Sequence, residues 1–143
     1  MTTEGSLEEL APRLRIEHAV PVMALRADEV PERPGVYVWY HEGTAAFVGV
    51  AKDLRHRVIT EHAARTTSVR SSALRRTPAQ TLGFGAKAEL RRGARLLSER
   101  EDAAVDEWLR SGRVAFAEVD QFEAAYALLT PLQTLYLGQS HKR

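Results

Sequence analysis

The residues best placed to do chemistry are basic and lie in the middle third of the sequence. Positions 50–100 hold two Lys and ten Arg against four acidic residues, a net charge of +8, although the whole 143-residue chain carries only +1. The Arg guanidinium group binds two phosphate oxygens at once, so such a segment favours a phosphate ligand. A solvated helical face is the alternative, and the charge excess alone does not decide between the two.

Part of this segment, positions 65–76, combines four Arg with five Ser and Thr residues. Hydroxyl and guanidinium groups suit contacts with phosphate rather than with bases. The candidates for nucleic-acid contact are the basic residues in and before this stretch: Lys52, Arg55, Arg65, Arg70, Arg75 and Arg76. Trp39 and Trp108 are large enough to stack on a base, but their strand and helix positions favour the core.

The composition excludes several other kinds of protein. The chain has no Cys, which rules out disulfides, zinc thiolate sites and a Cys nucleophile. With 44% hydrophobic and 27% charged residues it is typical of one folded domain. No apolar run approaches the ~18 residues of a membrane span, and the first residues lack a secretory signal. We therefore predict a cytoplasmic protein with no membrane partner.

Hydrophobic patterning predicts three strands, at residues 36–40, 45–50 and 114–119. The first two form a hairpin with a four-residue loop, His41 to Thr44. A helix capped by Asp53 follows and runs to about Arg65. The fold class is therefore α+β, with a small three-stranded antiparallel sheet flanked by helices.

Three further helices are predicted from capping residues and proline. Thr77 and Pro78 predict the start of one helix. Ser98 and Glu101 have the spacing of a capping box, and this second helix should end at Ser111-Gly112. The last helix is predicted to be capped by Asp120 and to run towards Pro131.

The chain divides into an N-terminal extension, a domain and a tail. Residues 1–30 should form a helical and strand extension whose first helix is capped by Ser6 and broken at Pro12. Residues 31–137 form the domain, and residues 138–143 a flexible tail.

Two tripeptides and one arginine then carry a resemblance. Gly35-Val36-Tyr37 is followed after nine residues by Phe47-Val48-Gly49, and Arg57 lies eight residues beyond Gly49. This order resembles the GIY-YIG nuclease domain over about residues 31–134. The Ser, Thr and Arg stretch also resembles an insertion in some bacterial stand-alone members of that family.

The resemblance implies a role for each matched residue. Tyr37 would orient or deprotonate the attacking water, Arg57 would neutralise the scissile phosphate, and a glutamate on the last helix would hold Mg²⁺ or Mn²⁺. Phe47 stands where the family usually has a second tyrosine and lacks its hydroxyl, and His62 is a further candidate near the helix. Tyr37 and Arg57 are expected to face one solvent-accessible cleft.

The last helix matches the family in two ways, which differ in the metal ligand. One alignment makes Glu123 the ligand, and we favour it because Pro131 then needs no large shift. The other alignment places Leu128 at the ligand position and leaves no metal site.

Three functions follow from these readings. The first is a metal-dependent endonuclease that hydrolyses phosphodiester bonds of a nucleic acid, with DNA favoured over RNA. A partner protein or a second copy of the chain would supply its specificity. The second is a nucleic-acid-binding module of the same fold without catalysis. The third is an enzyme of other chemistry that reuses the cleft.

Overall fold

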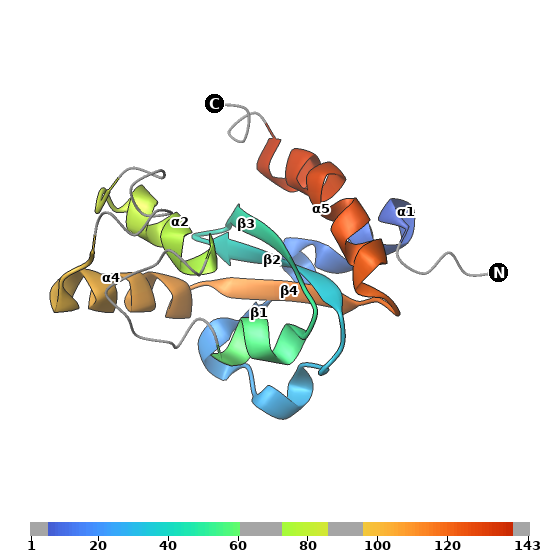
Figure 1. The fold of residues 1–143 in the computed structure, drawn as a ribbon, viewed down its shortest axis with the longest axis horizontal. Coiled ribbons are helices and arrows are strands. Elements are labelled where there is room, and N and C mark those ends of the chain that lie inside the picture. Colours follow the sequence, from blue (N-terminus) through green and yellow to red (C-terminus); the bar gives the residue numbers. More distant parts are fainter. Residues whose placement is uncertain (1–5, 61–72, 86–95, 139–143) are drawn as a thin grey trace.

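The computed structural model describes residues 6–60, 73–85 and 96–138 and has an α+β architecture (Figure 1). Its antiparallel sheet has the strand order β1-β4-β2-β3. The strands are β1 (Val20–Pro21), β2 (Gly35–His41), β3 (Thr44–Ala51) and β4 (Arg113–Glu118). The predicted fold class is confirmed, but the sheet has four strands and not three.

The extra strand, β1, lies in the N-terminal extension, where a strand was expected but not as part of the sheet. Its two residues pair with Val114 and Arg113 at the edge of the sheet. Proline is compatible with an edge strand because the missing N–H is not needed there. This segment is a strand because it pairs with β4.

The hairpin between β2 and β3 is tighter than predicted. His41 pairs with Thr44, so the loop consists of Glu42 and Gly43 alone, with φ of 53° and 82°. Positive φ at both central residues is characteristic of the two-residue turns that match the twist of the strands.

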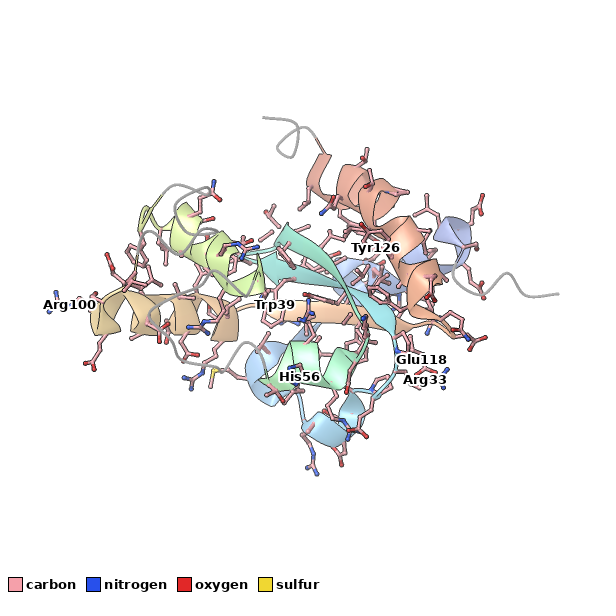
Figure 2. The ribbon with its side chains drawn as sticks, in the orientation of Figure 1. Arg33, Trp39, His56, Arg100, Glu118 and Tyr126 are labelled. Atoms are coloured by element: carbon pink, nitrogen blue, oxygen red, sulfur yellow. The ribbon has the colours of Figure 1, made fainter. Side chains whose placement is uncertain are left out.

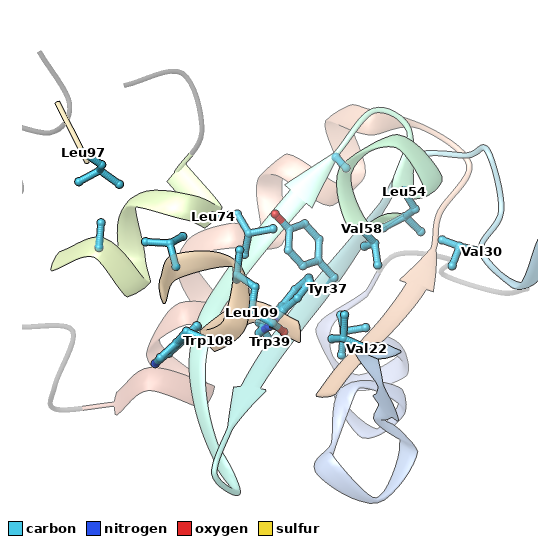
Figure 3. Packing of buried hydrophobic residues seen from close by; sticks show 14 residues of the cluster. Val22, Val30, Tyr37, Trp39, Leu54, Val58, Leu74, Leu97, Trp108 and Leu109 are labelled. Carbon is cyan, nitrogen blue, oxygen red and sulfur yellow. The ribbon is translucent and has the colours of Figure 1, made fainter. Parts of the chain in front are cut away.

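Helices cover both faces of the sheet. On the first face, Tyr37 and Trp39 of β2 pack against the η5 helix (His56–Thr60), α2 (Ala73–Thr81) and α4 (Glu99–Arg110) (Figure 3). On the second face, Val36 and Val38 pack against α1 (Leu7–Leu10), η1 (Ala11–Leu14) and α5 (Phe122–Leu137). The alternation of side chains along β2 thus separates two apolar clusters.

The N-terminal segment is tied into this core. Ser6 Oγ accepts a hydrogen bond from the Glu9 backbone N–H, as the predicted cap requires. α1 ends at Leu10, and the 3₁₀ helix η1, which contains Pro12, follows it, so the α-helix is broken near this proline as predicted. Three short 3₁₀ helices follow before β2: η2 (Ile16–His18), η3 (Val22–Ala24) and η4 (Ala27–Glu29). No helix within the described ranges is long and apolar enough to cross a membrane.

The capping box of α4 is confirmed. The Ser98 backbone N–H donates to Glu101 Oε1 at 2.9 Å, and the Glu101 N–H donates to Ser98 Oγ at 3.1 Å. The helix gives way to Ser111 and Gly112, as the sequence predicts. Both ends depend on residues within a few positions of each other, which explains why they were predictable.

Two other helix boundaries that were predicted from proline differ in the structure. The start predicted at Thr77 is wrong, because α2 already includes Ala73 and holds Pro78 inside it, with Leu74 and Ala79 buried on the first face. Likewise α5 continues past Pro131, since Pro131 lies on the exposed side, where water can satisfy the carbonyl that loses its partner.

The predicted cap of α5 is also wrong. Gln121 and not Asp120 is the N-cap residue, and it makes no side-chain cap hydrogen bond. The Asp120 carboxylate instead accepts from Arg33 Nη2 at 3.4 Å. Asp120 thus pairs with Arg33, which is distant in sequence, instead of capping the helix that follows it.

Candidate active site

The site begins with the close approach of Tyr37 to Gly49. These residues are paired across β2 and β3. A β-carbon at Gly49 would lie 2.6 Å from both Cζ and Oη of Tyr37. Any side chain at position 49 would therefore displace the phenol ring, so the glycine is required by the tyrosine.

Arg57 reaches the same stretch of β3. The predicted cap is present, because Asp53 Oδ1 accepts from the His56 backbone N–H at 3.2 Å. From the helix that follows, half-buried Arg57 extends Nη1 to within 3.5 Å of the Val50 carbonyl oxygen. Since Val50 adjoins Gly49, Tyr37 and Arg57 both contact residues 49–50.

The expected solvent-accessible cleft is not present at Tyr37. This side chain has 0% exposed surface and belongs to the first apolar cluster, where Leu54, Val58 and Leu74 also lie (Figure 3). A substrate can reach its hydroxyl only if neighbouring side chains move. Arg57, by contrast, is partly exposed.

Phe47 packs on Tyr37. Their ring centroids are 6.0 Å apart with an interplanar angle of 37°, and Phe47 is itself partly buried. An aromatic pair of this kind holds a ring in place. Phe47 therefore positions Tyr37 and has no group that could donate a proton.

Lys52 connects this region to the start of α5. Its side chain is exposed, and Nζ lies 5.6 Å from the centroid of the Phe122 ring. Glu123, the next residue, is exposed in the first turn of α5. A carboxylate thus lies beside the Lys52 contact, just past the end of β3.

Glu123 and Leu128 differ in whether they can hold a metal ion. Leu128 packs against the apolar cluster of the second face and has no donor atom. The Glu123 carboxylate is a hard oxygen donor, and Mg²⁺ often takes one or two carboxylates and keeps several waters. Across residues 6–60, 73–85 and 96–138, no three acidic or His side chains form a cluster that could hold a metal. Of the two residues, only Glu123 therefore has a donor atom for a divalent cation.

The predicted nucleic-acid contacts separate into surface and structural residues. Lys52 is exposed, whereas Arg55 donates from Nε to the Val30 carbonyl at 2.8 Å and lies 3.4 Å from Glu32. Arg76 is partly buried on α2. His62, Arg65 and Arg70 lie outside the described residues.

The prediction for Arg75 is wrong. Arg75 has 0% exposed surface, and its guanidinium lies 2.9 Å from Asp102 and 3.9 Å from Asp106 of α4. Asp106 also pairs with Arg110 at 2.8 Å. Arg75 therefore joins α2 to α4 in the interior and is not available to a ligand at the surface.

Both tryptophans belong to the core, as expected. Trp39 is fully buried and donates from Nε1 to the Leu109 carbonyl at 3.3 Å. Trp108 is 8% exposed, and its ring stacks on His41 with centroids 4.2 Å apart.

The pairing of partly buried Phe122 with exposed Tyr126 was not predicted from the sequence. Phe122 and Tyr126 lie one helical turn apart on α5, with ring centroids 6.1 Å apart, and Tyr126 is 63% exposed. Their i, i+4 spacing was the available signal. Apolar residues fill most of this helix, so the spacing alone does not separate an exposed ring from a core position.

Comparison with known proteins gives structural matches only. No protein-family model and no curated protein matches the sequence.

The structure is similar to solved structures of the GIY-YIG N-terminal endonuclease domain of UvrC from Thermotoga maritima. A tyrosine-to-phenylalanine variant of that domain, bound to its catalytic divalent cation, has 16% identity and a TM-score of 0.42, covering 76% of this chain and 81% of the other. The magnesium-bound domain has 18% identity and a TM-score of 0.38, covering 76% and 82%. The chain thus resembles GIY-YIG endonuclease domains in fold.

Proposed function

We propose that this protein is a metal-dependent endonuclease that hydrolyses phosphodiester bonds of DNA with a site of the GIY-YIG type. The observation that carries the proposal is the approach of Tyr37 and Arg57 to residues 49–50 of β3. The order of the two tripeptides and the arginine in the sequence supports it.

Each side chain has a defined task in such a reaction. The Arg57 guanidinium would neutralise the charge that develops on the scissile phosphate. The Tyr37 hydroxyl would orient the attacking water or accept its proton. A divalent cation, held by Glu123, would stabilise the charge on the leaving oxygen when bound. Lys52, exposed just past the end of β3, would contact a neighbouring phosphate.

A second candidate is a protein that binds nucleic acid but does not cut it. Two observations favour this function: the Tyr37 side chain has no exposed surface, and Phe47 has no hydroxyl. Binding through Lys52 and Arg57 requires neither group.

Cleavage assays on end-labelled DNA separate the two candidates. We expect wild-type protein to nick or cut single-stranded, duplex or branched DNA in the presence of Mg²⁺ or Mn²⁺. Arg57→Ala should abolish cutting, and Glu123→Gln should abolish cutting while leaving DNA binding largely intact. Glu99→Gln is the matched control, because Glu99 is also an exposed acid in the first turn of a helix.

The outcomes are distinct. Wild-type protein that binds DNA but cuts none of these substrates with either metal would establish the second candidate in place of the first. Glu123→Gln protein that cuts as fast as wild type would show that another residue holds the metal.

A further inference from the structure

We propose that Lys52, Phe122 and Tyr126 form a stacking platform for an unpaired nucleobase, and that the ligand of this protein is therefore single-stranded DNA or DNA with an unpaired nucleotide. The proposal deepens the function above and rests on it in taking nucleic acid as the ligand. We call these three residues the stacking platform.

The platform is built from two elements that are distant in sequence. Phe122 and Tyr126 share one side of α5, with rings 6.1 Å apart and tilted by 36°. Lys52, from the loop after β3, places Nζ 5.6 Å from the Phe122 ring centroid. A cation at this distance is attracted to the ring face. Lys52 and the two rings therefore form one continuous surface.

The open end of this surface is Tyr126. Its side chain is 63% exposed on α5 (Figure 2). Glu123, exposed next to Phe122, is the only charged residue of that helix. An exposed ring beside a cation matches a nucleotide, whose base has a π face and whose phosphate is an anion.

The position of the platform relates it to the candidate active site. Lys52 lies three residues after Gly49 and five before Arg57. α5 packs against β3, which carries Gly49 and Val50. α5 lies on the second face of the sheet and Tyr37 on the first, so a strand that contacts both Arg57 and the rings would cross the end of β3 at Lys52. In a duplex the bases are paired and stacked, so their faces are not free.

Binding measurements test the platform without reference to cleavage. Fluorescence anisotropy would compare labelled oligo(dT) with a duplex of equal length, in EDTA so that no DNA is cut. Wild type should bind the single strand more tightly. Tyr126→Ala should weaken single-strand binding about 5- to 150-fold, as expected for the loss of one stacked base, and duplex binding much less. Tyr126→Phe keeps the ring and should bind like wild type.

Leu135→Ala is the matched control. Leu135 is 56% exposed on the same helix but nine residues further along, away from Lys52. It should leave both affinities unchanged. Equal losses in Tyr126→Ala and Leu135→Ala would overturn the platform and indicate a general apolar docking face for a protein.

The remaining results separate this inference from the proposed function. Wild-type protein that prefers the single strand through Tyr126 but never cuts DNA would support the platform and refute the endonuclease. Protein that cuts DNA with unchanged single-strand affinity in Tyr126→Ala would support the endonuclease and refute the platform. Failure to bind the single strand at low salt would also refute the platform.

Discussion

The phenol ring of Tyr37 lies directly on the backbone of Gly49, so that a β-carbon at position 49 would stand 2.6 Å from the tyrosine Cζ and Oη. It would also stand 2.9 Å from Cε2 of Phe47. The Tyr37 ring of β2 thus packs against the backbone of β3 at a position without a side chain. This contact has consequences for both stability and activity.

Gly49→Ala should destabilise the protein by about 1–3 kcal/mol, because the added methyl group overfills a packed interior. It should also reduce any DNA cleavage, because Tyr37 must move. Urea unfolding followed by circular dichroism measures the first effect. In a Tyr37→Ala background the same substitution should cost less, giving a coupling of roughly 0.5–3 kcal/mol. Equal costs in both backgrounds would show that Tyr37 does not restrict position 49.

Replacing the buried Arg75 should strongly lower the free energy of unfolding, although the sequence predicted a ligand contact at this position. Arg75→Met leaves the Asp102 carboxylate, 6% exposed, without its 2.9 Å partner. Removing one member of a buried ion pair costs about 3–5 kcal/mol. Chemical denaturation should show a loss of this size.

Arg100→Met is the control for Arg75→Met. Arg100 is exposed on α4 and extends away from the protein (Figure 2), and its replacement should change stability by about 0.5 kcal/mol or less. A similarly small change for Arg75→Met would contradict the buried ion pair.

The ionisation of Tyr40 should lower the free energy of unfolding at high pH. Burial, followed by the nearby Tyr136 and Glu17, raises the pKa of Tyr40 above its ordinary value of 10.0. Its hydroxyl donates to the Leu14 carbonyl at 2.6 Å. Above pH 10 the unfolded chain loses this proton while the folded protein keeps it. Stability present below pH 10 should therefore decline as the pH rises towards the folded-state pKa.

Tyr40→Phe should cost about 1 kcal/mol at neutral pH through the lost hydrogen bond and should flatten the alkaline decline. Some decline should remain, because burial also raises the pKa of Tyr136. Unfolding free energies measured between pH 8 and 11 test this. An alkaline slope equal to that of wild type would exclude Tyr40 as its source.

Salt dependence tests the surface role of Lys52. The logarithm of DNA affinity should fall with the logarithm of salt concentration by about 0.9 per neutralised phosphate. Lys52→Ala should reduce that slope by about 1, since it removes one phosphate contact. Arg26→Ala, at an exposed residue paired with Asp28, is the control and should leave the slope unchanged. A slope unaffected by Lys52→Ala would remove Lys52 from the DNA contact.

Several features depended on residues close together in sequence and were predictable for that reason. The capping box of Ser98 and Glu101 and the cap at Asp53 each involve residues three positions apart. The hairpin of β2 and β3 joins adjacent apolar runs. For the candidate site, the sequence placed Tyr37 and Gly49 on paired strands and Arg57 on the helix that follows.

The remaining features depended on partners that sequence order does not reveal. Arg75 appeared to be a surface cation because its partner Asp102 lies 27 positions away on another helix. β1 exists only where β4 offers an edge, and the stacking platform requires the start of α5 to reach Lys52. Local patterns specify strands and helices through short-range hydrogen bonds and periodicity. Whether a charge is buried or a ring is exposed depends on which distant segments pack together. Only the tertiary structure decides this packing.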